Sequence, residues 1–339
     1  MARSQVTIRD VANLAGVSHQ TVSRVINNSK RVSLETRRRV EKAIKELDYR
    51  PNAIARSMAK GYTHTLGCIS PNLTDYIFSS MIESAQIEAR CHNFFLLTGC
   101  ASSADDVPPL LDEMLKRRVD GLLILNPRDD DRYLHLLPLI EHGMPVVYLK
   151  NSPKQEAVSA VCADDENGGY QATQYLLELG HTQIAIITGR ENEECTQDRL
   201  KGYCKALSEA GIKVDEKLIV KGNWFADSGE KAIRQLLASK IPFSAVFAQN
   251  DRMAVGCIRA LRDAGLRVPQ DVSVVGYDDI PLASFFDPPL TTIRQPMDEF
   301  GRQGAQLLID AVKDKDYVPK QVRLNTQIIK RYSCATLKT

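Results

Sequence analysis

The body of this 339-residue chain alternates short apolar runs with amphipathic segments, and this alternation limits the possible folds more than any other feature. The apolar runs are THTLGCIS, FFLLTG, DGLLILN, PVVYLK, QIAIITG, SAVFAQN and DVSVVGYDD. Helical patterns separate them, and three such patterns are followed by Gly180, Gly211 and Gly265, as is usual at helix ends. This order is typical of βαβ units with a parallel sheet buried on both faces. Because the alternation extends over about 270 residues, more than one doubly wound unit needs, we predict two α/β lobes.

Charge is distributed unevenly along the chain. The net charge is +2, but the first 62 residues contain 13 Lys and Arg against 5 Asp and Glu, a net charge of +8. The remaining residues therefore carry a net charge of −6. A small basic head on a mildly acidic body favours a polyanionic partner for the head alone. A solvated charged face is the alternative, and the order of residues within the head decides between the two.

Three short helices are predicted in this head. Thr7 can cap a first helix that Gly16 ends, and Ser18 and Ser33 can cap a second and a third. Residues expected to face a common core recur at one-face spacing, namely Ile8, Val11, Ala12 and Ala15, then Val22, Val25 and Ile26, then Thr36, Val40, Ala43, Ile44 and Leu47. Two helices joined by a tight turn that contains glycine form a helix-turn-helix.

The second helix has a polar face suited to reading DNA. His19, Gln20, Ser23 and Arg24 share the face opposite the apolar one. In a major groove, Gln20 can form two hydrogen bonds with adenine and Arg24 can form two with guanine. Arg37, Arg38 and Arg39 lie near the start of the third helix, where they oppose the helix dipole, so we expect them to contact phosphates. Each side chain alone could be an ordinary exposed residue, but their gathering on one face favours DNA binding.

A short hinge helix is expected after the head. Pro51 can occupy the first position of a helix that continues over residues 52–60, with Ile54, Ala55, Met58 and Ala59 on one side. A helix of this length is marginally stable in isolation. We therefore expect it to fold when two copies pack together in the minor groove of DNA. A plain linker over residues 52–60 is the alternative.

Four motifs occur in fixed order between Thr7 and Gly61: T-I-x-D-V-A-x-x-A-G-V-S, T-V-S-R-V-I-N, V-S-x-x-T-R-x-x-V and L-x-Y-x-P-N. With them, the head resembles that of the lactose-repressor (LacI/GalR) family of bacterial transcription regulators. The resemblance implies DNA contacts from Thr7, Ser18, His19, Gln20, Thr21, Ser23, Arg24, Asn27, Arg31, Asn52, Ala55 and Met58. Where the family has a leucine that opens the central base step, this chain has Met58, a softer wedge of similar volume.

The resemblance continues almost to the C-terminus and implies a domain organisation. A helix-turn-helix DNA-binding domain is expected over residues 1–50, a hinge helix or linker over 51–62, and an effector-binding core over 63–339. The core is expected to consist of two periplasmic-binding-protein-like lobes of doubly wound parallel sheets. With crossings near Ala163, Thr292 and Arg323, lobe 1 would comprise 63–162 and 293–322, and lobe 2 would comprise 163–292 and 323–339.

The sequence contains no visible catalytic, cofactor or metal motif. The patterns GxxxxGK[ST], GxGxxG, GxSxG and HExxH are missing, and the six histidines are scattered. Gly168-Gly169 opens a helix and is interpreted as a site of close helix–strand packing. The eight cysteines form no CxxC or CxxH pair, which favours reduced thiols. Because these motifs are missing, we predict that the protein is not an enzyme and has no cofactor. Because there is no long apolar run and no signal-like N-terminus, we predict a cytoplasmic location, and the DNA-binding head predicts association with the nucleoid.

Polar residues follow the predicted strands at the edge where open α/β sheets bind ligands. They are Ser70-Pro71-Asn72, Asn126, Gly189-Arg190, Gln249-Asn250-Asp251 and Tyr277-Asp278-Asp279. A carboxylate can accept two hydroxyl hydrogen bonds, and a guanidinium can donate two in a fixed fork. This set of groups therefore suits a polyhydroxyl ligand.

The segments DRLKGY, GNWFADSG, QNDRMAVG and VVGYDD…PPLTTIRQP resemble the family's effector-domain motifs. The resemblance implies effector contacts from Asn72, Phe78, Arg199, Trp224, Asn250, Asp278 and Gln295. Trp224 would pack against a sugar ring, with a place in the lobe core as the alternative. Asp251 is expected to cap a helix. Glu193 and Cys195 replace an arginine and a threonine of the family's purine-binding member, which argues against a purine. The acidic sugar contact that some members have just after the fourth strand has no clear counterpart in Lys150-Asn151-Ser152-Pro153.

These observations predict a transcriptional regulator, most readily a repressor, that binds a palindromic operator as a homodimer and responds to a sugar or sugar derivative. A dimer is expected because a twofold protein suits a twofold site and the chain ends without a leucine heptad. A regulator that depends on a corepressor or a phosphoprotein is the alternative. A cytosolic sugar-binding protein or sugar-metabolising enzyme is a more distant one.

Overall fold

The structure is a computed structural model and describes residues 6–26, 29, 31–49, 62–126, 131–151 and 157–337. The chain divides into two compact units, Met1–Thr63 and His64–Thr339, each with its own apolar core. The predicted DNA contacts Asn27, Asn52, Ala55 and Met58 lie outside the described residues, as does the expected hinge helix.

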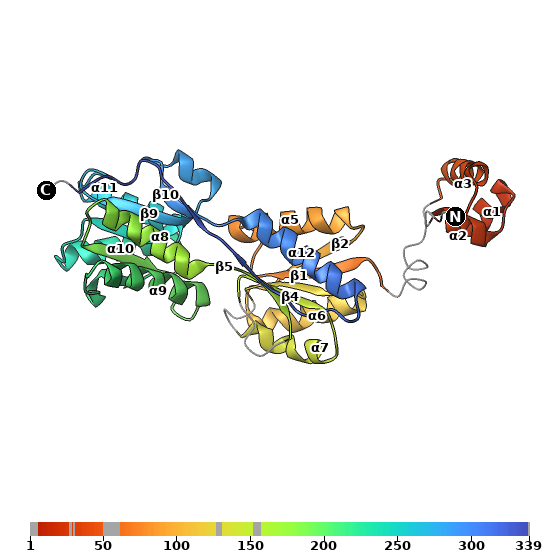
Figure 1. The fold of residues 1–339 in the computed structure, drawn as a ribbon, viewed down its shortest axis with the longest axis horizontal. Coiled ribbons are helices and arrows are strands. Elements are labelled where there is room, and N and C mark those ends of the chain that lie inside the picture. Colours follow the sequence, from red (N-terminus) through yellow and green to blue (C-terminus); the bar gives the residue numbers. More distant parts are fainter. Residues whose placement is uncertain are drawn as a thin grey trace. The chain divides into compact units, whose positions relative to one another are not determined.

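The N-terminal unit contains three helices around a small core (Figure 1). They are α1 (Ile8–Ala15), α2 (His19–Ile26) and α3 (Leu34–Glu46). The three predicted caps are present, since the backbone N–H groups of Asp10, Thr21 and Thr36 donate to the hydroxyls of Thr7, Ser18 and Ser33. Gly16 ends α1 at φ 61°, as predicted, and leaves a tight turn before α2. Val11, Val22 and Val40, one from each helix, are fully buried. The head is therefore the predicted helix-turn-helix.

The C-terminal unit is built on two six-stranded sheets, as the alternation predicted. Sheet 1 has the order β11-β5-β4-β3-β1-β2 and is parallel throughout. Sheet 2 has the order β12-β10-β9-β8-β6-β7, and only β12 is antiparallel to its neighbour. The strands are β1 (Thr65–Ser70), β2 (Phe95–Cys100), β3 (Leu122–Leu125), β4 (Val146–Leu149), β5 (Ser159–Ala163), β6 (Ile184–Thr188), β7 (Ile219–Lys221), β8 (Ala245–Ala248), β9 (Ser273–Asp278), β10 (Thr291–Arg294), β11 (Gln321–Leu324) and β12 (Gln327–Ile329).

Helices cover both faces of each sheet (Figure 1). On sheet 1, α6 (Val107–Lys116) and α7 (Leu137–Glu141) cover one face, and α5 (Tyr76–Cys91) and α12 (Met297–Lys313) pack together on the other. On sheet 2, α10 (Ala226–Ala238) and α11 (Asp251–Asp263) cover one face, and α8 (Asp165–Glu178) and α9 (Glu194–Glu209) the other. Four short 3-10 helices complete the described elements: η1 (Ala104–Asp106), η2 (Arg132–His135), η3 (Glu216–Leu218) and η4 (Pro281–Phe285).

Three segments connect the two sheets and make each lobe discontinuous. The first joins β5 to α8, the second joins β10 to α12, and the third joins β11 to β12. Strand membership places these crossings after Ala163, Arg294 and Leu324, the last two slightly later than the expected Thr292 and Arg323. Because parallel strands share a direction, the carboxyl ends of each sheet lie on one edge, and the side chains there can form a site.

Glycine permits two of the closest helix packings near that edge. A Cβ on Gly169 in α8 would overlap the backbone of Arg199 in α9. A Cβ on Gly168 would overlap the Tyr277 ring on β9. The helix–strand packing predicted for this pair is therefore confirmed at Gly168, while Gly169 serves a helix–helix contact. Together they bring Arg199 close to β9.

Candidate functional site

The exposed face of α2 carries the side chains expected to read DNA. His19, Gln20 and Arg24 are exposed, while Val22 and Val25 on the same helix are buried. Ser23 is half-buried. This arrangement leaves two side chains with the geometry for bidentate base contacts on one helix face.

Other residues predicted to contact DNA also form hydrogen bonds within the head. The Thr7 and Ser18 side chains cap helices, and the Thr21 hydroxyl lies 3.0 Å from that of Ser18. Arg31 is exposed, and its backbone N–H donates to Ser29 Oγ at 3.3 Å. The phosphate contact expected of Arg37 stays a prediction, and its Nη2 donates to the Ser29 carbonyl at 2.9 Å.

A cavity of about 580 Å³ lies between the two lobes. Its volume is within the range of small-molecule sites in proteins. Six of the predicted effector residues line it: Asn72 and Phe78 from lobe 1, and Arg199, Trp224, Asn250 and Asp278 from lobe 2. Lys150, Glu193 and Cys195 are also in its walls.

Asp278 presents a carboxylate to the cavity from the end of β9. Its Oδ1 accepts a 2.7 Å hydrogen bond from Gln295 Nε2, and the residue is 7% exposed. Burial raises the pKa of Asp278 to about 6, although the positive charges of Arg199 and Lys150 oppose the shift. A carboxylate in this state can still accept ligand hydroxyls near neutral pH.

Arg199 is held rigidly behind the cavity by a hydrogen-bonded cluster. Its Nε donates to Asp165 Oδ1 at 2.8 Å, and its Nη1 donates to the Gln249 carbonyl at 2.5 Å. The guanidinium carbon lies 3.6 Å from the centre of the Tyr277 ring, and the Tyr277 hydroxyl donates to the same Asp165 oxygen at 2.8 Å. Burial raises the pKa of Asp165, but the charges of Arg199 and Lys150 more than offset it and hold that pKa below its usual value. The cluster fixes the direction of the guanidinium without ligand.

Trp224 forms an aromatic wall that is fixed from three sides. Its Nε1 donates to Glu193 Oε2 at 2.7 Å, and its carbonyl accepts from Asn250 Nδ2 at 3.0 Å. A Cβ on Gly189 would overlap the indole ring. Trp224 lines the cavity and also packs against the core of lobe 2, so its contact with the core is confirmed and its contact with a sugar ring stays a prediction.

The helix cap expected of Asp251 is made by Asn250 instead. Asn250 caps α11, because its Oδ1 accepts from the Met253 N–H at 2.8 Å. With its Nδ2 bound to the Trp224 carbonyl, the Asn250 amide shapes the wall. Asp251 is wrongly predicted as a cap: it is fully buried and accepts from Thr292 Oγ1 at 2.5 Å and the Ile280 N–H at 2.8 Å.

Gln295 does not line the cavity, although the sequence suggested a ligand contact. It lies in the crossing between β10 and α12 and is 3% exposed. Its Nε2 donates to Asp278 in lobe 2, and its Oε1 accepts from Lys150 Nζ in lobe 1 at 3.4 Å. Asn72 acts locally too, since its Oδ1 accepts from the Asp75 N–H at 2.8 Å at the start of α5. Both residues position others around the cavity.

Sequence reasoning missed the ion pair that joins the lobes at the cavity. Arg252 Nη1 of α11 lies 2.5 Å from Asp75 Oδ2, which precedes α5. The Arg252 guanidinium also lies 4.7 Å from the centre of the Phe225 ring. Nothing in the local sequence links positions so far apart. The available signal was that Arg252 follows directly after the predicted strand end at Gln249-Asn250-Asp251.

Four of the eleven non-glycine residues with a left-handed backbone in the described part of the chain line the cavity. Asn126, Lys150, Trp224 and Asp278 have φ values of 48°, 74°, 77° and 111°. Side chains other than glycine rarely adopt such values, and each costs about 1–3 kcal/mol. The clustering of strained residues at one place is a common mark of a functional site.

Within the described residues, no group of three His, Cys, Asp or Glu side chains could hold a metal ion. All eight cysteines are free of disulfides. Among the same residues, no helix combines the length and the apolar character needed to cross a membrane.

Comparison with known proteins supports the division into head and core. Residues 7–52 match the model of bacterial regulatory proteins of the lacI family, and residues 173–334 match a periplasmic binding protein-like domain. The HTH-type transcriptional repressor PurR of Vibrio atlanticus (strain LGP32) is 35% identical over 98% of this chain and 99% of its own length. A solved complex of the transcriptional regulator CelR with cellobiose is 36% identical, with TM-score 0.75, over 97% of this chain and all of that one. The lac repressor dimer bound to operator and the anti-inducer ONPF is 32% identical, with TM-score 0.86, over 98% of this chain and all of that one.

A helix-turn-helix head joined to a two-lobed core with a ligand cavity defines a transcriptional regulator rather than an enzyme. Identity above 30% over nearly the whole length of these relatives makes the assignment specific. The chain belongs to the LacI family of bacterial regulatory proteins.

Proposed function

We propose that the chain is a repressor that binds a near-palindromic operator as a homodimer and whose operator affinity is controlled by a sugar-like effector. It acts at the nucleoid, in the cytoplasm of a bacterium. The effector binds in the cavity between the lobes. A ligand shifts a conformational equilibrium only by its different affinity for the two states, and a ligand between the lobes has such a difference when its contacts change as the lobes move.

One observation carries this proposal: the cavity is walled by both lobes and brings together Asp278, Arg199 and Trp224. A carboxylate, a guanidinium and a fixed aromatic face are the groups that bind the hydroxyls and the apolar face of a sugar ring. The cellobiose bound to the related CelR supports a sugar-like ligand. The Asp75–Arg252 ion pair between the lobes supports a closure that the effector can stabilise or oppose.

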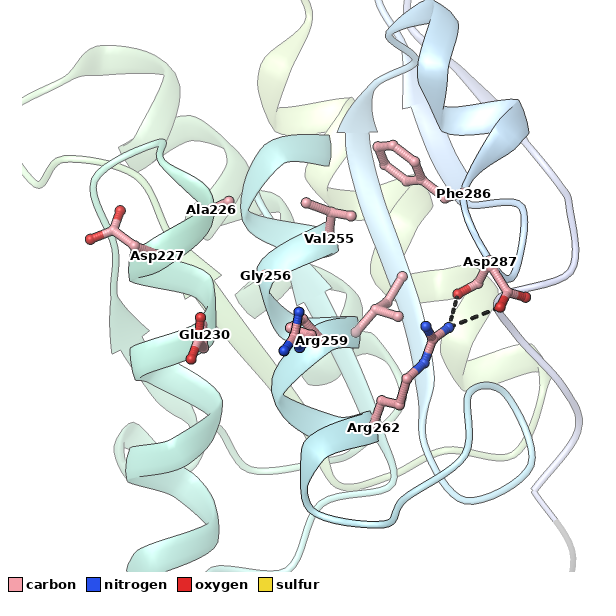
Figure 2. Close-up of a pocket in the computed structure, with 10 residues that line it drawn as sticks. Ala226, Asp227, Glu230, Val255, Gly256, Arg259, Arg262, Phe286 and Asp287 are labelled. Carbon is pink, nitrogen blue, oxygen red and sulfur yellow. Dashed lines mark hydrogen bonds and ion pairs between the residues drawn. The ribbon is translucent and has the colours of Figure 1, made fainter.

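A hollow on the outside of lobe 2 supplies a surface for dimer formation. It measures about 460 Å³ and lies between α10, α11 and the segment after η4. Figure 2 shows Asp227 and Glu230 on α10, Arg259 and Arg262 on α11, and Phe286 at the rim. Each of these charges has an ion-pair partner within the chain, namely Lys231 for Asp227, Arg234 for Glu230, Asp263 for Arg259 and Asp287 for Arg262, so a second copy would meet a surface of balanced charge.

Exposed apolar residues of η4 extend this surface. Leu282 is 63% exposed and Phe285 is 83% exposed. Phe285→Lys should therefore raise the dissociation constant of the dimer, measured by sedimentation velocity, without changing the fold of the monomer. Leu134→Lys, at an exposed position of η2 in lobe 1, is the matched control. A Phe285→Lys protein with an unchanged dissociation constant would place the dimer interface elsewhere.

The function is tested by selecting operator sequences from random DNA with the purified chain, and then measuring operator affinity with and without a panel of sugars. A twofold-symmetric site and a sugar that changes operator affinity by about 5–150-fold, the usual allosteric range, are expected. If no DNA sequence is enriched, with or without the sugars, the proposed function as a transcriptional regulator is refuted.

Substitutions of two arginines in the head distinguish a contact with a base from a contact with phosphate. Arg24→Ala should cost about 1–3 kcal/mol on the selected operator and relax the preference at one base position. Arg38→Ala, on the exposed surface of α3, should weaken selected and random DNA equally. If Arg24→Ala loses affinity equally for selected and random DNA, Arg24 contacts only phosphate.

A further inference from the structure

Lys150 is a cavity cation with spare hydrogen-bond donors. It follows β4 and faces the cavity from lobe 1. Among the described residues, its side chain makes a single hydrogen bond, from Nζ to the neutral amide oxygen of Gln295 at 3.4 Å. An ammonium group has three donors. The remaining two are therefore open to a ligand in the cavity.

The other cations that line the cavity lie near carboxylates. Arg199 pairs with Asp165 at 2.8 Å, and Arg252 pairs with Asp75 at 2.5 Å. Arg190 Nη1 lies 3.8 Å from Glu193 Oε1. Among the described residues, Lys150 has no carboxylate oxygen within 4 Å. Its charge acts on Asp165, Glu193 and Asp278 from a longer distance, but it forms no direct ion pair among the described residues.

The cavity offers a ligand both a cation and a hydroxyl acceptor. Lobe 1 presents the ammonium of Lys150 together with Asp75, and lobe 2 presents the Asp278 carboxylate and the face of Trp224 together with Arg199 and Arg252. Asp278 accepts a single hydrogen bond, on Oδ1, among the described residues, so Oδ2 can receive hydroxyl donors. A ligand with hydroxyls at one end and an anionic group at the other matches both walls.

We propose that Lys150 binds an anionic group of the effector, a carboxylate or a phosphate, so that the effector is a sugar acid or a sugar phosphate rather than a neutral sugar. The proposal rests on the function proposed above and specifies its ligand. An anionic group in contact with Lys150 gains a charge-assisted hydrogen bond, which is about twice as strong as one between neutral groups. Hydroxyls bound at Asp278 then tie lobe 2 to the same molecule. The cavity, at about 580 Å³, has room for such a ligand.

Trp224 provides a direct measurement, because it is the only tryptophan in the chain and it lines the cavity. The intact protein is titrated with matched sets, each comprising a neutral hexose, its hexonate and its 6-phosphate, for glucose, galactose and mannose. We expect one anionic member to change Trp224 emission at a concentration at least tenfold lower than its parent hexose. The hexonate and 6-phosphate arms distinguish the two sources of the anionic group.

Variants at position 150 assign the preference to this side chain. Lys150→Gln should weaken the anionic ligand at least tenfold and leave the parent hexose within threefold, whereas Lys150→Arg should retain the preference. Lys240→Gln is the matched control, since Lys240 is exposed and also has a left-handed φ, of 55°. Thermal unfolding without ligand checks that each variant is folded.

Three results would overturn this assignment: a neutral hexose that binds as tightly as its acid and its phosphate, a Lys150→Gln protein that loses both classes equally, or no response to any anionic ligand of the set. A neutral sugar that changes operator affinity would refute the anionic effector but leave the regulator intact. Failure to bind any selected operator would refute the regulator whatever the cavity binds.

Discussion

Replacing Asp278 by asparagine should make the protein more stable while it destroys the effector response. Burial raises the pKa of this carboxyl from 3.8 to about 6. The difference corresponds to about 3 kcal/mol for keeping Asp278 ionised in the folded chain, relative to the unfolded one. Asparagine has the same shape, cannot ionise, and can still accept the hydrogen bond from Gln295.

The effect depends on pH in a defined direction. Because its pKa is raised on folding, Asp278 binds a proton more tightly in the folded chain, so its contribution lowers stability as the pH rises from about 4 to 6. Above pH 6 the cost is fully present. The free energy of unfolding of Asp278→Asn should thus exceed that of the parent by well under 1 kcal/mol at pH 4 and by about 3 kcal/mol at pH 7–8.

Urea unfolding at a series of pH values measures this difference. Because Trp224 emission is the signal, the measurement reports on the core alone. Asp105→Asn removes an exposed carboxylate in η1 and should stay within about 0.5 kcal/mol of the parent throughout. A difference for Asp278→Asn that is the same at every pH, or a variant that is less stable at pH 8, would refute the reasoning. A stable variant with a normal effector response would remove Asp278 from the binding site.

Three further substitutions test the surroundings of the cavity. Gly189→Ala introduces a methyl group that overlaps the Trp224 ring, so it should shift Trp224 emission and weaken effector binding at least tenfold; an unchanged emission spectrum would contradict this. Arg252→Ala removes the ion pair with Asp75 and should cost the closed arrangement about 1 kcal/mol, or about fivefold in effector affinity, with the difference from the parent shrinking in high salt. Gln295→Ala should leave effector affinity within threefold but reduce the change in operator affinity, because Gln295 bridges the lobes behind the cavity; loss of effector binding instead would make it a ligand contact.

The helical head could be predicted almost completely because local signals determine it. Thr7, Ser18 and Ser33 cap helices whose apolar spacing is regular, and Gly16 adopts the left-handed conformation expected of a helix end. The contact of Arg37 with Ser29 was not predicted. The Arg37 guanidinium reaches the carbonyl of Ser29, a contact that depends on the packing of α3 against the end of α2.

Strands with long apolar runs could be recognised in the core, whereas short strands could not. The run DVSVVGYDD contains β9, but the three-residue strands β7 and β12 owe their existence to pairing with a longer neighbour. β5 is composed largely of Ser and Ala, which have little strand preference of their own. Such strands are decided by tertiary contacts rather than by local composition.

The sequence predicted the residues that line the cavity better than it predicted the hydrogen bonds among them. Strand ends correctly marked Asp278 as a cavity residue, since the carboxyl edge of a parallel sheet follows from the strand order. The capping role of Asn250 and the bridging role of Gln295 depend on side-chain directions that strand order does not determine. The Asp75–Arg252 pair joins different lobes and has no counterpart in any local pattern.

The late position of β11 and β12 has a consequence for synthesis of this protein. These strands complete the edges of both sheets, yet they occupy residues 321–329, at the far end of the chain. A ribosome adds about 5–20 residues per second, so the helical head can fold many seconds before either lobe has its last strand. Nascent chains that stall before residue 321 would therefore carry a finished DNA-reading head on an unfinished sensor, and such products are natural targets for proteases.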